Sequence, residues 1–179
     1  MAYNDLYLLR RNGADTGPIV TVQESCGDKL FTGEMKACTT QFDAVTGTTG
    51  ATLTNIVGLT GFNLIAGATY AFEIYISGVS TTNCGIKLGF KYTTATLTSL
   101  LSIATAHAAA STATVQTTTA TDQATLFGSN AAAWLGVRLT GQIVVNAAGT
   151  LALQAAQNAA HADTTSVYAG STMRLTRIG

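Results

Sequence analysis

Charged residues are scarce in this sequence. Asp, Glu, Lys and Arg make up only 10% of the 179 residues, and the formal net charge is zero, whereas ordinary globular proteins are about 25% charged. A nucleic-acid-binding protein needs a basic cluster to displace counterions from phosphates, so the composition argues against a nucleic-acid partner. Because so few charges would leave an isolated monomer poorly soluble, we expect much of the surface to be covered by other subunits.

Long apolar runs and paired cysteines are also missing. The longest charge-free stretches are interrupted by Thr, Gly, Gln and Asn, and they fall short of the roughly 20 apolar residues that a membrane-spanning helix needs. The first residues do not follow the pattern of a signal peptide, because an acidic residue comes first and a basic pair follows a short apolar run. Cys26, Cys38 and Cys84 are odd in number and have no paired spacing. We therefore expect reduced thiols, in a protein made in a cytoplasm and without a membrane partner.

Residues that carry catalysis or bind metals form no recognisable pattern. The sequence contains neither a Gly-rich phosphate loop nor a G-x-S-x-G motif. His161-Ala-Asp163 imitates a general base with its orienting acid, but no nucleophile is specified, and we interpret His161 as a loop residue. The cysteine spacing matches no zinc site, and the acidic residues do not cluster as calcium loops require. We expect no enzymatic activity, no metal and no cofactor.

Alanine and threonine are the abundant residues, with about 30 of the first and a similar number of the second. Threonine favours strands because its branched side chain fits a pleated surface. Alanine is small, so an alanine-rich core must bring backbones close together. A thin two-sheet sandwich satisfies this requirement, and so does a tight symmetric contact between subunits.

Alternation of apolar and polar residues predicts a succession of short strands. The alternating runs are 52–56, 69–76, 85–92, 134–145, 149–154 and 171–178. The residues predicted to face the core in the clearest two runs are Tyr70, Phe72, Ile74, Ile76, Ile86, Leu88, Phe90 and Tyr92, with Glu73, Tyr75, Lys87 and Lys91 on the opposite side. Many short alternating runs, each closed by Gly or Asn, indicate an all-β, antiparallel sandwich or barrel.

Two segments depart from this pattern. Residues 93–133 are rich in Ala, Thr and Ser, and the run 104–110 favours a helical turn by its alanine content. The threonines that follow favour strand and loop, which is our prediction for this segment. Residues 1–45 differ in another way, because ten of the eighteen charged residues fall between Asp5 and Asp43. We expect this segment to be an N-terminal arm or an extra strand pair, and residues 46–179 to form the sandwich domain.

Five segments of the sequence carry a resemblance to a known family. They are Thr54-Asn-Ile-Val-Gly-Leu59, Ala66-Gly-Ala-Thr-Tyr-Ala-Phe-Glu73, Gly149-Thr-Leu-Ala-Leu-Gln-Ala-Ala-Gln-Asn158, Thr164-Thr-Ser-Val-Tyr-Ala-Gly-Ser171 and Thr172-Met-Arg-Leu-Thr-Arg-Ile178. Over roughly residues 52–179 the chain resembles a structural module of tailed bacteriophages, which occurs in head decoration (cement) proteins, head fibres and tail-fibre parts. The resemblance implies a jelly-roll fold, often trimeric.

The decoration protein is the function we expect first. It would bind the outer surface of the phage head as a homotrimer, with the major capsid protein as its partner, and stabilise the shell after assembly in the host cytoplasm. The alternative is a head-fibre or tail-fibre domain that binds a host receptor or glycan. Tyr and Arg are enriched where binding energy concentrates, and Arg pairs bidentately with carboxylates. The capsid-contact residues expected on this basis are Leu6, Tyr7, Leu8, Leu9, Arg10 and Arg11.

Overall fold

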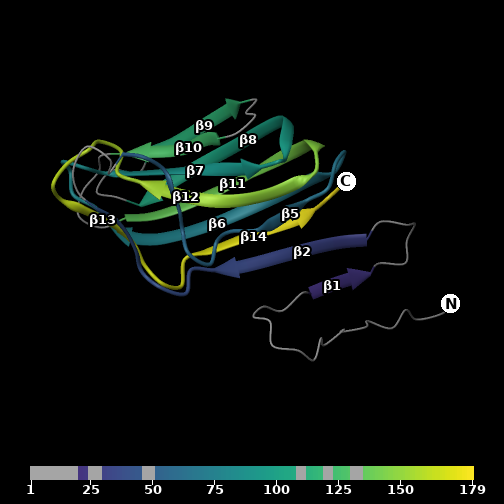
Figure 1. Cartoon of the computed structure of the whole chain (residues 1–179), viewed down its shortest axis with the longest axis horizontal. Helices are drawn as coiled ribbons and strands as arrows, with labels where there is room; N and C mark the ends of the chain where they lie inside the picture. The colour runs from purple at the N-terminus through teal and green to yellow at the C-terminus, as the bar shows by residue number, and fades with distance from the viewer. Residues whose placement is uncertain (1–19, 24–29, 46–50, 108–111, 119–122, 130–134) are drawn as a thin grey trace.

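The computed structural model is an all-β protein. It describes residues 20–23, 30–45, 51–107, 112–118, 123–129 and 135–179, and within these ranges it contains fourteen strands and no helix. The described residues therefore include no helix that could cross a membrane. All the strand pairs are antiparallel, and the strands form a nine-stranded and a five-stranded sheet (Figure 1).

The larger sheet begins and ends the described chain. Its strands, in spatial order, are β1 (Val20–Gln23), β2 (Leu30–Ala37), β14 (Thr172–Arg177), β6 (Thr69–Val79), β11 (Leu135–Ala147), β8 (Thr96–His107) and β9 (Thr112–Thr118), with β3 (Phe42–Val45) paired to β13 (Thr164–Val167) and β13 also paired to β6. The smaller sheet has the order β10 (Gln123–Ser129), β7 (Ile86–Thr93), β12 (Gly149–Ala156) and β4 (Thr54–Asn55), and β5 (Phe62–Leu64) also pairs with β12.

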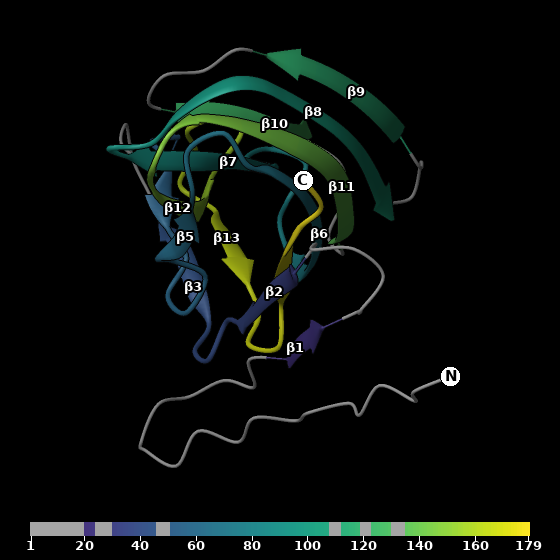
Figure 2. The same ribbon diagram turned by 90° about the vertical axis from the view of Figure 1, so that its right-hand side faces the viewer.

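The order of these strands is that of a jelly roll. Strands β2, β14, β6 and β11 form one layer, and β4 with β5, β12, β7 and β10 form the other, so the chain passes repeatedly between the two sheets. This is the eight-stranded, double-sheet arrangement that encloses one core. The hairpin β8–β9 is inserted between β7 and β10, and it widens the larger sheet beyond β11. Figure 2 shows this hairpin arching over β10. The predicted fold class is confirmed.

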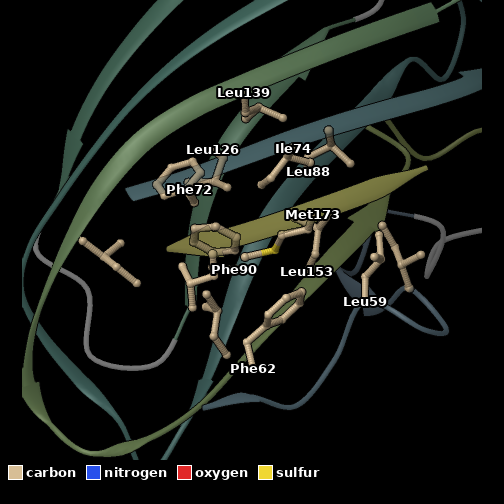
Figure 3. Close-up of a cluster of buried hydrophobic side chains, with 14 of the residues drawn as sticks. Leu59, Phe62, Phe72, Ile74, Leu88, Phe90, Leu126, Leu139, Leu153 and Met173 are labelled. Atoms are coloured by element: carbon tan, nitrogen blue, oxygen red, sulfur yellow. The ribbon is translucent and has the colours of Figure 1, made fainter. Parts of the chain in front are cut away.

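The core lies between the sheets and follows the predicted alternation. All eight inward residues predicted in β6 and β7 are buried, from Tyr70 to Ile76 and from Ile86 to Tyr92. Phe72 of the larger sheet and Phe90 of the smaller one meet edge to face, with ring centroids 5.2 Å apart (Figure 3). Such a pair contributes about 0.5–1.5 kcal/mol beyond its buried area. The aromatic side chains therefore join the two sheets at their centre.

Small residues make room for the Phe72 ring. Phe72 is opposite Gly141 of β11, and Gly141 is opposite Ser102 of β8. A Cβ atom at Gly141 would lie 2.7 Å from Phe72 Cε1 and would overlap the Leu101 carbonyl oxygen. Ordinary contacts between carbon atoms are about 3.5–4.0 Å, so the sheet accepts this ring only over a glycine. The absence of a side chain at Gly141 thus provides the space that the Phe72 ring occupies.

Lys36 closes the edge of the sandwich between β2 and the turn before β5. Its ammonium Nζ donates to the carbonyl oxygens of Thr60 (2.7 Å) and Gly61 (3.0 Å), and it lies 4.9 Å from the centroid of the Phe62 ring. The Glu34 carboxylate is 3.0 Å from the same nitrogen. Hydrogen bonds from a charged donor are stronger than neutral ones. This side chain therefore ties the larger sheet to the smaller one.

Several predicted elements differ in extent from the observed ones. Strand β8 continues through His107, so residues 104–107 are strand, as predicted for the segment 93–133, because pairing with β11 and β9 extends over them. The run predicted at 52–56 is shortened to β4. Strands β2 and β3 join the larger sheet. The division of the chain at residue 45 stays a prediction.

Candidate interaction surface

The two sheets expose very different outer faces. On the smaller sheet, residues 151–156 of β12 are buried on both sides of the strand. Lys87 Nζ donates to the Ala51 carbonyl oxygen (2.7 Å), and Gln154 Nε2 donates to Asn55 Oδ1 (2.8 Å) across this face. The outer side of β12, in the smaller sheet, is therefore covered within the chain itself.

The larger sheet leaves its outer face open, and large apolar side chains lie on it. We call this surface the outer sheet face. Its described residues include Met35, Ala71, Glu73, Tyr75, Leu101, Ile103, Thr105, Arg138, Thr140, Gln142, Thr172 and Arg174. Met35 is 53% exposed, and Tyr75, Leu101 and Ile103 are 45–46% exposed. Between them lie Ala and Thr side chains, which are short and uncharged.

A hydrogen-bonded network occupies the centre of the outer sheet face. Arg138 Nη2 lies 2.6 Å from Glu73 Oε1, and the Tyr75 hydroxyl donates to the same carboxylate oxygen. The Arg138 guanidinium also lies 5.3 Å from the centroid of the Tyr75 ring. The hydrogen bonds from Tyr75 and Arg138 lower the pKa of Glu73, and the bond to Glu73 raises the pKa of Tyr75. Both side chains of the ion pair are thus held in one arrangement.

From residue 101 onward, strand β8 carries its large aliphatic residues on its outward side. The inward positions hold Leu100 and then the small residues Ser102, Ala104 and Ala106, all buried. Its outward positions hold Leu101 and Ile103. Ser102 lies opposite Gly141, over which the Phe72 ring packs. The folded chain by itself does not explain why the outward positions are aliphatic.

A second group of polar side chains joins the loops at one end of the sandwich. The Asp163 carboxylate accepts hydrogen bonds from Thr81 Oγ1 (2.6 Å) and Asn83 Nδ2 (3.0 Å), which lower its pKa. The Asp163 backbone N–H donates to His161 Nδ1 (3.1 Å). Cys84 lies beneath this group with no exposed surface, and it contacts Thr165 Oγ1 at 3.2 Å. The arrangement closes a loop and presents no accessible nucleophile at Cys84.

The side-chain amide of Gln157 also makes hydrogen bonds within this loop. Gln157 Nε2 donates to the Asp163 carbonyl oxygen, and its Oε1 accepts from the His161 backbone N–H (3.0 Å). His161 therefore belongs to the loop between β12 and β13, as interpreted from the sequence. Cys38 and Cys84 are free thiols, both buried. Within the described ranges, no three residues of the His, Cys, Asp and Glu types gather as a metal site.

The capsid-contact residues predicted from the sequence cannot be compared with this surface. Leu6, Tyr7, Leu8, Leu9, Arg10 and Arg11 all lie outside the described residues, so their role stays a prediction. Sequence reasoning placed Tyr75 and Glu73 on the outward side of β6 but missed the gathering of Met35, Leu101 and Ile103 around them. The sequence signal for this gathering was in residues 97–106, where aliphatic residues stand on both sides of the strand.

Comparisons with known proteins add little. No family model matches the chain, and no curated protein matches it. A capsid protein of infectious bursal disease virus, VP2 in a subviral particle, is similar with a TM-score of 0.28 and 10% identity, over 96% of this chain and 46% of VP2. A mutant VP2 of the same virus in T=1 particles gives a TM-score of 0.18 and 9% identity, over 91% of this chain and 45% of that one. The chain spans about half the length of these proteins, and the scores are too low to carry an argument.

The described residues define a fold and one exposed surface. The chain is an antiparallel jelly roll whose larger sheet is open on its outer side. Its described surface offers a broad, weakly charged face for contact with another macromolecule.

Proposed function

We propose that this chain is a virion structural protein that decorates the outside of a tailed-phage head as a homotrimer. Its partner is the major capsid protein, and its role is to stabilise the shell. A trimer that makes several modest contacts at once binds far more tightly than one subunit, because the second and third contacts form at high effective concentration. The low charge and the open outer sheet face support an assembly subunit.

One observation carries the proposal: the segments that resemble phage head and fibre modules lie together in the fold. The segment 54–59 contains β4, which pairs with β12 of the segment 149–158. The Ile56 backbone N–H donates to the Leu153 carbonyl oxygen (3.0 Å), and the Leu153 N–H donates to the Leu59 carbonyl oxygen (2.8 Å). These segments are about a hundred residues apart in the chain, yet they form one structural unit.

The other matched segments pair in the same way. Strand β6, which begins within 66–73, lies beside β14 of the C-terminal segment, with Phe72 opposite Leu175. The resemblance therefore covers contiguous parts of both sheets and is more than two unrelated short matches. It supports the module as a whole, and the decoration role is the one of its roles that we propose first.

Binding to purified heads that lack the protein tests the proposal. We expect the full chain to bind such heads, and electron microscopy to show density repeated over the capsomer junctions. Copy numbers typical of a single fibre or tail would instead support the alternative, a domain that binds a receptor or glycan. No binding to heads would refute the decoration role.

The predicted contact residues are tested in the same assay. Arg10→Gln with Arg11→Gln removes both charges, and we expect weaker binding to heads with the trimer intact. Arg177→Gln is the matched control, because Arg177 lies on β14 and donates to the Gly179 carbonyl oxygen (3.2 Å). Unchanged binding of the double variant would refute the role of Arg10 and Arg11.

A further inference from the structure

We infer that the outer sheet face is the contact between copies of this chain, with Leu101 and Ile103 of β8 at its centre. The inference deepens the proposed function, since it names the surface through which the proposed homotrimer forms. Single exposed apolar residues are normal on any protein. Here they are aligned: Met35, Arg174, Glu73, Thr140 and Ile103 are successive cross-strand partners over five strands.

The register of β8 in the sheet fixes the exposure of Leu101 and Ile103. Pairing between β11 and β8 extends from Gly136 to Ala147, so the register of β8 is fixed over most of its length. A shift by one residue would exchange the two faces of the strand. It would bring Leu101 and Ile103 inward, where the Phe72 ring already fills the space over Gly141. The fold therefore holds these aliphatic side chains outside, where only a partner can bury them.

A second copy fits the size of this face. Five strands from β2 to β8, at roughly 4.8 Å spacing, give a width of about 19 Å. The 11 residues of β6, the longest of the first three strands, at roughly 3.3 Å each, give a length of about 36 Å. The product is roughly 700 Å², close to the ~800 Å² that each partner contributes to a stable protein interface. The face is thus large enough to form one side of a lasting contact.

The charges also favour a second copy over a strongly charged partner. Glu73 is paired with Arg138, and Arg174 lies directly opposite Glu73 on β14. The face therefore has no block of one sign that would repel a copy of the same chain. Tyr, Met and Arg, which are enriched in interface cores, are its largest side chains. Ala71, Thr105 and Thr140 are short, so another surface can approach closely.

The geometry of a closed trimer gives this face a specific use. In a ring of three, each copy offers one surface to one neighbour and a different surface to the other. The outer sheet face is the first of these surfaces. Its partner patch on the neighbour is a different surface of the same chain.

The test is the oligomeric state of the full chain with Ile103→Glu, measured by light scattering over a range of concentrations. Ile65→Glu is the matched control, because Ile65 is 50% exposed, close to the 46% of Ile103, and lies in the turn before β6, away from the outer sheet face. We expect the wild type and the control to be trimers, and Ile103→Glu to associate at least tenfold more weakly. A trimer as stable as the wild type in Ile103→Glu would overturn the inference.

A milder variant covers the case in which the charge introduced at position 103 disturbs folding. Ile103→Thr keeps a branched side chain that suits a strand, and we expect it to weaken the trimer several-fold with an unchanged circular dichroism spectrum. Head binding is measured on the same samples. Trimers of Ile103→Thr that no longer bind heads would assign the face to the capsid and overturn the inference. If the trimer depends on Ile103 but the wild type does not bind heads, the inference is supported and the decoration role is refuted.

Discussion

Replacing Gly141 by alanine tests how the core accommodates the Phe72 ring. The added Cβ would lie 2.7 Å from Phe72 Cε1 and would also press on the Leu101 carbonyl oxygen. Overpacking of this kind costs about 1–3 kcal/mol, while the loss of glycine flexibility in the unfolded chain returns about 0.4–1 kcal/mol. We expect Gly141→Ala to lower the free energy of unfolding by about 1–2 kcal/mol, from the balance of these terms.

Urea denaturation at one fixed protein concentration measures this change, since the stability of an oligomer depends on concentration. Gly33→Ala is the control, because a Cβ atom there meets nothing closer than 3.6 Å, and we expect it to be neutral or slightly stabilising. In a Phe72→Leu background, Gly141→Ala should cost about 1 kcal/mol less, since contacting residues couple by about 0.5–3 kcal/mol. Additive effects of the two substitutions would refute the role assigned to the ring.

Three further predictions concern single polar groups. Tyr92 is buried, and its hydroxyl has no hydrogen-bond partner among the residues that the structure describes. Tyr92→Phe should therefore leave stability unchanged or raise it by up to about 1 kcal/mol, measured by urea denaturation; a loss of stability would contradict this. The folded pKa of Asp163 is lowered, so its contribution is present above the ordinary carboxyl range and lost as pH falls through that lowered pKa. Asp163→Asn should therefore flatten the acid limb of a plot of unfolding free energy against pH, and an unaltered limb would contradict this. Lys36→Met should lower the melting temperature, because the carbonyl oxygens of Thr60 and Gly61 lose a charged donor, and an equal melting temperature would show that water replaces it.

The parts of the fold that were predictable are those with a local signal. In β6 the apolar residues alternate strictly, so Phe72 and Ile74 were placed inward from the sequence alone. In β8 the apolar residues Leu100, Leu101 and Ile103 stand on both sides of the strand, which hides the period. Packing against the core explains only the inward residues of such a strand. A pattern that assumes one buried face therefore fails there.

The outer sheet face was not predictable, because it depends on strand order. Met35 and Ile103 are far apart in the chain and share a row only because β14, β6 and β11 lie between their strands in this order. Outward position can be read from alternation, but neighbours across a sheet cannot. The predicted segment 1–45 had a local signal in its charges. The surface that this segment would bind belongs to another molecule, so the sequence of this chain cannot identify it.

The place of β14 between β2 and β6 sets an order of folding events. Strand β2 pairs with β1 and β14, and it reaches the rest of the larger sheet through β14. Residues 30–37 must therefore wait for residues 172–177, and contacts between such distant segments form slowly. Until β14 docks, β6 has an unpaired edge along Tyr70–Tyr75, the kind of edge on which foreign strands add. The β1–β2 pair is accordingly expected to join the larger sheet only after β14.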